Sequence, residues 1–316
     1  MKTTIETSAN STTTRTAANV SVQRKLKRYV LRAPVVPDKL ILSADLLTKI
    51  QRIELALGSQ PNVDWHRAYD SINALGQNIE DGKQISSHST WPYIAKLQHC
   101  LGRHSTERLV DEERIMRHRS LIERMVVEKK ARILVEGIAS TSSEIFVAAL
   151  LQISAEMRGV NVGKFRKQDI KLRGDRHGWT WQFPNHNAIE SCLHELHRVL
   201  HEKSLGSALV EATITYLILN WIHAFPDGNG RTSRGVFNIL LQRKVVSSQY
   251  YLPIKEINYL AQGGHEIRLR YAVATNEFED LLDYFVNAAA LYEEILRSRV
   301  DLNNQVDLNF AKKKLL

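Results

Sequence analysis

The stretch ITYLILNWIHAFPDGNGRTSRGVFNILL, residues 214–241, contains two apolar segments separated by a short polar one. Apolar side chains dominate residues 214–222 and 236–241, with the density that is typical of buried helices. Between them, residues 223–234 read HAFPDGNGRTSR, in which proline, glycine and asparagine favour a turn. The pattern predicts two buried helices joined by a tight loop.

The residue types in this loop suit the binding of phosphate. Gly228, Asn229 and Gly230 tolerate positive φ angles, so that their backbone N–H groups can converge on an anion. The next helix begins at the same place and adds unpaired N–H groups and the positive end of its dipole. Arg231 and Arg234 are three residues apart and therefore project from one side of its first turn. Guanidinium groups bind phosphate oxygens as bidentate forks.

Two further side chains extend this chemistry. Asp227 offers a hard oxygen ligand that suits Mg²⁺ bound to phosphates, and His223 is a base that titrates near neutral pH. The loop is not the P-loop of nucleotide hydrolases, because the sequence has no GxxxxGK[ST] pattern. A glycine-asparagine turn with incidental charges is the alternative, but two arginines, an acid and a histidine within twelve residues make it the weaker interpretation.

Composition places the chain among ordinary globular proteins. Of 316 residues, 43% are hydrophobic and 24% are charged, and no uncharged apolar run is long enough to predict a membrane span. The two cysteines form no CxxC pair, which disfavours a cysteine zinc site and fits a cytoplasmic location. The net charge of +9 admits nucleic acid, an acidic protein or a polyanionic ligand as a partner.

The chain divides into four predicted parts. Residues 1–23 form a disordered tail rich in Thr and Ser, residues 24–140 an N-terminal helical region, residues 141–300 the core, and residues 301–316 a polar tail. We interpret the basic run at residues 24–28 as a solvated flank, with contact to nucleic acid as the alternative. Helices are predicted over 43–57, 64–79, 111–138 (as one helix or two), 142–153, 187–201, 207–223, 230–245, 254–262 and 266–298.

One segment departs from the helical pattern. Residues 165–183 surround two glycines with aromatic and aliphatic side chains, and residues 179–183 alternate as WTWQF. Such alternation is typical of a half-exposed strand, so we expect a small β-hairpin in an otherwise helical protein. Basic residues along this hairpin would be solvent-exposed, or would dock an acidic partner or nucleic acid. Trp179 and Trp181 are expected to pack on the helices rather than to stack on bases.

The loop at residues 223–234 resembles the signature of Fic-domain proteins, His-x-Phe-x-Asp/Glu-Gly-Asn-Gly-Arg-x-x-Arg, and matches all eight specified positions. Ala224 replaces the proline that usually follows the histidine. Residues 142–285 resemble the wider domain, and Gly163 to Arg166 resemble its Gly-x-aromatic-Arg segment. The resemblance implies a mainly α, Fic-type helical bundle with a small β-hairpin flap that aligns the target. It also implies transfer of AMP from ATP to a hydroxyl of a target protein.

The same resemblance implies a role for each residue of the loop. His223 would be the general base, and Phe225 would anchor the loop in the core. Asp227 would hold Mg²⁺ on the phosphates, and the N–H groups of residues 228–230 would bind the α- and β-phosphates. Arg231 would lie on the β-phosphate side and Arg234 at the γ-phosphate.

Many Fic proteins carry an inhibitory helix whose glutamate pairs with the second arginine of the signature. The closest match here is GQNIEDG at residues 76–82, with Glu80 as the inhibitory residue and Gly76 in place of the usual Ser or Thr. Glu144 is a rival, but it better suits the first turn of the helix that Ser142 or Ser143 begins. The alternative for Glu80 is an acid that merely lies at a helix end.

His194, His197 and His201 recur at helical spacing and form the last candidate cluster. They flank an apolar stripe, so we expect them on the solvated side of a helix rather than as ligands of a metal. The sequence thus predicts a protein adenylyltransferase that uses Mg²⁺ and ATP on an unidentified target protein, with Glu80 as its candidate inhibitor. Open alternatives are removal of AMP with Glu80 positioning water, transfer of UMP or phosphate, and a basic regulator that binds nucleic acid. Nucleic acid is the less favoured partner, and the sequence leaves the oligomeric state open.

Overall fold

The computed structural model describes residues 27–30, 34, 40–58, 71–72, 74–76, 89–98, 136–171, 179–202, 205–244, 251–261 and 263–297. The tails predicted at 1–23 and 301–316 lie outside the described residues. The helix predicted over 111–138 also lies outside them, except for residues 136–138. The described helices are α1 (Ala44–Gly58), α3 (Trp91–Gln98), α5 (Ser143–Arg158), α6 (Ile189–Glu202), α7 (Ala208–Ile222), α8 (Asn229–Lys244), α9 (Ile254–Leu260), α10 (Gly264–Thr275) and α11 (Glu279–Arg297), with a 3-10 turn at His186–Ala188. The protein is mainly helical, as predicted.

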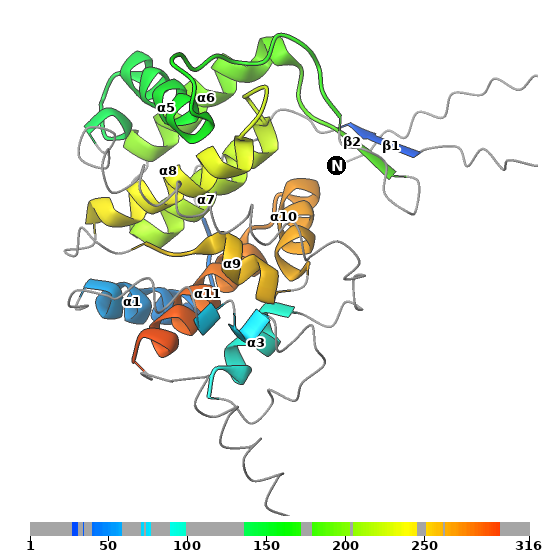
Figure 1. Ribbon diagram of the computed structural model, residues 1–316. Coiled ribbons are helices and arrows are strands. Elements are labelled where there is room, and N and C mark those ends of the chain that lie inside the picture. Colours follow the sequence, from blue (N-terminus) through cyan, green and yellow to red (C-terminus); the bar gives the residue numbers. More distant parts are fainter. Residues whose placement is uncertain are drawn as a thin grey trace, which may run out of the picture.

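The antiparallel pair α7 and α8 forms the centre of the fold (Figure 1). Side chains of α7 are buried from Ala208 through Leu219, as expected for a predominantly apolar helix. In Figure 1 helices α5 and α6 lie on one side of this pair, and α1, α3 and α11 on the other. Both sides therefore contribute to one hydrophobic core, which holds the loop between α7 and α8 at a fixed position.

Helix α1 of the N-terminal region helps to begin α7. The side chain of Ser207 accepts a hydrogen bond from the backbone of Val210, which caps the helix. Its hydroxyl also donates to Oε1 of Glu54 in α1 at 2.7 Å, and the backbone N–H of Leu209 donates to the same oxygen at 2.8 Å. The N-terminal region is thus tied to the core helix whose other end carries the loop.

The C-terminal helices differ from the prediction in one respect. A single helix was expected over residues 266–298, but Asn276 adopts a left-handed conformation with φ 63° and ends α10. Asparagine tolerates this conformation better than most residues, so it caps the helix and allows α11 to start in a new direction. The predicted continuous helix is therefore wrong at this point.

The strands also differ from the sequence-based expectation. Strand β2 (Trp179–Gln182) begins an antiparallel pairing through the bridge between Lys171 and Gln182, and residues 172–178 of the predicted hairpin lie outside the described part. On β2 a second strand, β1 (Lys27–Val30), pairs in parallel, with Tyr29 opposite Trp181 (Figure 1). Part of the basic run, Lys27 and Arg28, therefore lies in a strand. A local sequence pattern cannot disclose such a distant partner.

No helix in the described part of the chain is long and apolar enough to cross a membrane.

Candidate active site

The loop between α7 and α8 begins at His223. This residue caps the C-terminal end of α7 in a left-handed conformation, with φ 51°, and its N–H donates to the carbonyl oxygen of Leu219 at 3.0 Å. A positive φ at a residue other than glycine is uncommon and often marks a functional position. Here it turns the chain away from the helix axis and leads it to the start of α8 at Asn229.

The side chain of Asn229 holds the loop closed. Its Oδ1 accepts a hydrogen bond from the N–H of Phe225 at 2.8 Å, and its Nδ2 donates to the carbonyl oxygen of Phe225 at 2.7 Å. Asn229 is buried, as is Phe225, whose ring packs against that of Phe165 at 5.9 Å between centroids. Asn229 therefore shapes the loop through its side chain, and its backbone N–H is the group it can offer to a phosphate.

Two glycines permit close packing of the loop. Gly228 has φ 77°, and a Cβ there would lie 2.9 Å from Cγ of Arg158, so that a larger residue would be both strained and crowded. A Cβ at Gly230 would lie 3.2 Å from Nη1 of Arg234. Because both glycines lack a Cβ, Arg158 and Arg234 can approach the backbone at the beginning of α8.

Arg231 is fixed at the edge of the loop. Its Nη1 donates to the carbonyl oxygen of Met157 at 2.6 Å, and its Nη2 donates to Oδ2 of Asp227 at 3.1 Å. The loop lines a pocket of about 310 Å³. The lining residues are His223, Pro226, Asp227, Gly228, Asn229, Gly230, Arg231, Arg234 and Lys255. The structure therefore brings together every residue that the sequence assigned to base, metal and phosphate.

The imidazole of His223 lies in an apolar, partly enclosed position. The ring of Phe183 stacks on it with 4.2 Å between centroids and 21° between planes. Burial lowers the pKa of His223 to about 4, and the positive charge of Arg166 acts in the same direction. A backbone hydrogen bond at Asn220 and the charge of Asp227 oppose the shift without cancelling it. His223 is therefore uncharged near neutral pH and able to accept a proton.

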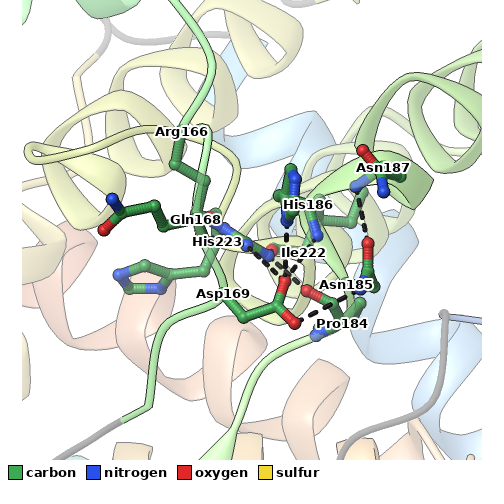
Figure 2. A network of polar contacts seen from close by, with 9 residues as sticks. All are labelled: Arg166, Gln168, Asp169, Pro184, Asn185, His186, Asn187, Ile222 and His223. Carbon is green, nitrogen blue, oxygen red and sulfur yellow. Dashed lines mark hydrogen bonds and ion pairs between the residues drawn. The ribbon is translucent and has the colours of Figure 1, made fainter.

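Arg166 fixes the backbone around this histidine (Figure 2). It is buried, and its Nε donates to the carbonyl oxygen of His223 at 2.9 Å. Its Nη1 donates to the carbonyl oxygen of Gln168 at 2.8 Å, while Nη2 donates to those of Pro184 and Ile222. One guanidinium thus joins the end of α7, the segment after α5 and the end of β2.

Asp169 supports the same network from the outside (Figure 2). One of its carboxylate oxygens lies 3.8 Å from Nη1 of Arg166 and accepts a hydrogen bond from the backbone N–H of His186 at 2.9 Å. The other accepts a bond from Asn185 at 3.2 Å. Hydrogen bonds from His186 lower the pKa of the carboxyl group of Asp169. This second layer holds the chain that follows β2, and hence the position of Phe183.

Comparison with protein-family models supplies the deciding observation. Residues 143–241, which include α5, the loop and most of α8, match the model of the Fic/DOC family. The chain contains a Fic domain. No curated protein matches the sequence.

The chain is similar to solved structures of Fic proteins, one of which has a TM-score above 0.5. A Fic family protein from Desulfovibrio desulfuricans G20 has a TM-score of 0.52 and 17% identity, over 84% of this chain and 76% of that one. Fic-1 from C. elegans, residues 134–508, has a TM-score of 0.46 and 14% identity, over 80% and 72%. A Fic domain containing signaling protein from Bacteroides thetaiotaomicron has a TM-score of 0.44 and 13% identity, over 80% of this chain and 98% of that one. The first of these supports a Fic-type helical fold that extends beyond residues 143–241.

The inhibitory residue that the sequence suggested for this Fic domain, Glu80, lies outside the described residues. Gly76, at the start of the candidate segment, is described and packs against α9. A Cβ at Gly76 would lie 2.7 Å from Cε1 of Tyr259, so a Ser or Thr at this position would require the ring to shift.

Glu144, the rival candidate, lies in the first turn of α5, as the sequence indicated. Its carboxylate accepts a hydrogen bond from the hydroxyl of Ser142 at 2.6 Å, which is the main reason that its pKa is lowered. Ser142 in turn accepts from the N–H of Ile145 and caps the helix. Glu144 therefore stabilises the start of a Fic-domain helix.

The three histidines of α6 form no metal centre: the described residues contain no group of three side chains able to hold a metal ion. His197 is buried, and its Nε2 lies 2.9 Å from the carbonyl oxygen of Ser140. The expectation that all three face solvent is thus wrong for His197. An imidazole can bury its ring and satisfy one nitrogen on a nearby carbonyl, which a hydrophobic-stripe argument does not take into account.

Proposed function

We propose that this protein is an adenylyltransferase, which moves AMP from ATP to the hydroxyl of a Ser, Thr or Tyr residue in a target protein. The observation that carries the proposal is the position of an uncharged, half-buried His223 at a pocket lined by the phosphate loop, Arg231 and Arg234. The presence of a Fic domain supports a transferase.

The start of α8 is suited to the phosphates of the nucleotide. The first N–H groups of a helix have no partner within the helix, and the backbone N–H groups of residues 228–230 would donate to the α- and β-phosphates. Arg231 and Arg234 would bind the outer phosphate oxygens as charge-assisted donors. Because Met157 and Asp227 already hold Arg231 in place, little ordering of its side chain is needed when the nucleotide binds.

His223 would act as the general base. As the target hydroxyl oxygen forms a bond to the α-phosphorus, the imidazole accepts the hydroxyl proton. The bond between the α-phosphorus and the oxygen bridging to the β-phosphate breaks, and pyrophosphate leaves. The loop N–H groups would stabilise the charge on the phosphate oxygens during this step. Phe183 and Arg166 would keep the imidazole oriented through the stacking and hydrogen bonds described above.

Asp227 fits a magnesium ion bound together with the nucleotide. Its carboxylate faces the pocket and is largely exposed, and no cluster of three metal-binding side chains surrounds it among the described residues. Mg²⁺ commonly binds through one or two carboxylates plus phosphates and water, which matches this arrangement. When bound, the ion would neutralise part of the phosphate charge.

Autoinhibition by Glu80 is part of the proposal. Gly76 packs against Tyr259 of α9, and Lys255 of the same helix lines the pocket. The first residue of the candidate inhibitory segment therefore packs against α9, the helix whose Lys255 lines the pocket. This neighbourhood supports Glu80 over Glu144, which is engaged at the beginning of α5.

The experiment that tests the function compares two labels. The protein is incubated with Mg²⁺, a cell extract and ATP labelled at either the α- or the γ-phosphate, and labelled protein is measured. We expect label only from the α-position, and labelling slowed by about 10²–10⁴-fold with His223→Ala.

Each contrary result points to a different activity. Label from the γ-position would indicate phosphate transfer, and preference for UTP would indicate UMP transfer. Release of AMP from a modified protein would indicate that the enzyme removes AMP. Salt-dependent DNA binding that survives His223→Ala would indicate a regulator that binds nucleic acid.

A further inference from the structure

Lys255 of α9 lines the pocket beside the loop. Of the described lining residues, it is the one that comes from outside residues 223–234. No motif marks it in the sequence, so its place at the site depends on how α9 is attached to α8.

Asn238 makes this attachment. It is fully buried, and its Oδ1 accepts a hydrogen bond from the N–H of Leu252 at 2.7 Å. Its Nδ2 donates to the carbonyl oxygen of Leu252 at 3.2 Å and to that of Arg234 at 3.1 Å. The side chain of Asn238 thereby joins the segment that leads into α9 to the turn of α8 that carries Arg234.

This attachment determines from which side Lys255 reaches the pocket. Along α8 each residue advances about 1.5 Å, so Arg234 lies one to two turns from the start of the helix and Asn238 one turn further. His223 lies before the start of α8. Lys255 therefore enters the pocket from a segment that is joined to the Arg234 turn of α8, whereas His223 lies before the start of that helix.

The charge of the pocket suits a long polyphosphate. Arg231, Arg234 and Lys255 are cationic, Asp227 is anionic, and His223 is uncharged near neutral pH. The excess of positive charge favours several phosphates over one. A lysine ammonium group is a compact charge on a flexible stem, which suits a terminal phosphate.

We propose that Lys255 binds the terminal phosphate of the nucleotide and makes the site prefer a triphosphate over a diphosphate, with Asn238 as its positioning residue. This inference rests on the proposed function. With His223 at the α-phosphorus, the last phosphate would lie toward the Arg234 turn, to which Asn238 joins the segment that leads to Lys255.

The test measures calorimetric affinities for Mg·ATP and Mg·ADP. We expect Lys255→Met to weaken ATP binding about 10-fold or more, the size of one lost charge-assisted hydrogen bond, and to change ADP binding less than about 2-fold. Lys255→Arg should retain most of the preference. Lys164→Met, an exposed lysine that does not line the pocket, is the control and should change neither affinity.

Two contrary outcomes separate the role of Lys255 from the proposed function. If the wild-type protein binds ATP and Lys255→Met leaves the ratio of ATP to ADP affinity unchanged, the role of Lys255 is refuted while the proposed function stands. If the wild-type protein binds neither nucleotide, both are refuted.

The test of Asn238 as a positioning residue requires a measured quantity that a purely structural role would leave unchanged. We expect Asn238→Ser to lower the preference for ATP in the wild-type background and to have no further effect on it in Lys255→Met, since the two residues act on one contact. An equal effect of Asn238→Ser on that preference in both backgrounds would show that it does not act through Lys255. Thermal melting of each variant shows whether it is folded under the conditions of the titration.

Discussion

The ring of Phe183 stacks on the imidazole of His223 with 4.2 Å between their centroids. Phe183 follows β2 directly, so the strand and the candidate base are joined by a side-chain contact. Because this contact excludes water from one face of the imidazole, it contributes to the burial that keeps His223 unprotonated.

The pKa of His223 predicts activity in mild acid. With a pKa of about 4 in the folded protein, the base is protonated only well below the ordinary value of 6.5. We therefore expect kcat/KM to keep its value as pH falls from 7 to about 5. Phe183→Ala should expose the imidazole, raise its pKa and move the acid limb of the profile upward. Identical profiles for the two proteins would contradict this role of Phe183.

The same shift predicts how stability depends on pH. The unfolded chain binds a proton at His223 near pH 6.5, whereas the folded protein does so only near pH 4. Between these values the unfolded state holds more protons, so the contribution of His223 to stability decreases as pH falls through this window. In His223→Gln this part of the decrease should disappear. Urea denaturation at pH 7 and pH 5 measures it, and an unchanged difference would contradict the low pKa.

Removal of the base should separate chemistry from binding. We expect His223→Ala to slow labelling by about 10²–10⁴-fold while nucleotide affinity remains close to that of the wild type. The reason is that His223 precedes the phosphate loop rather than forming part of it. Labelling at the wild-type rate would show that another group takes the proton.

Charged residues of the loop should behave in the opposite way. Asp227→Ala and Arg231→Ala are expected to weaken binding of Mg·ATP, because one removes the metal ligand and the other a phosphate donor. Lys167→Ala, an exposed residue outside the pocket, should leave affinity unchanged. Calorimetric titration of the three variants decides the matter, and equal affinities would refute a phosphate site at this loop.

Autoinhibition leads to a prediction that contrasts two acids. If Glu80 reaches Arg234, it neutralises the cation meant for the γ-phosphate and displaces the nucleotide, and a misplacement of about 1 Å can cost on the order of 100-fold in rate. We expect Glu80→Gly to increase self-labelling at least about tenfold, with a loss of stability below about 1 kcal/mol. Glu144→Gly should not activate, since Glu144 supports the start of α5. Activation by Glu144→Gly but not by Glu80→Gly would assign the inhibitory role to Glu144 instead of Glu80.

Much of the site could be predicted from the sequence because its parts are adjacent in the chain. His223, Asp227, Arg231 and Arg234 lie within twelve consecutive residues, in the loop after α7 and the beginning of α8, and local rules suffice to place such residues together. The predicted helices at residues 142–153 and 207–223 are confirmed for the same reason, since each has a serine cap and an apolar face.

The remainder depends on contacts between distant segments. Lys255 reaches the pocket only because Asn238 holds Leu252, and no local pattern shows that contact. Arg166 was noted as part of a family segment, but its bonds to four carbonyl groups require the folded chain. The end of α10 at Asn276 could have been foreseen from the preference of asparagine for helix ends.

The parallel pairing of β1 with β2 has a consequence for any other chain that approaches this strand. An extended peptide that pairs with the same edge of β2 must displace Lys27–Val30, which belongs to the same molecule. A tethered segment of this kind acts at an effective concentration on the order of millimolar. Weak, non-specific strands would therefore be excluded from the neighbourhood of Phe183 and His223, and only a partner held by additional contacts would replace the resident strand.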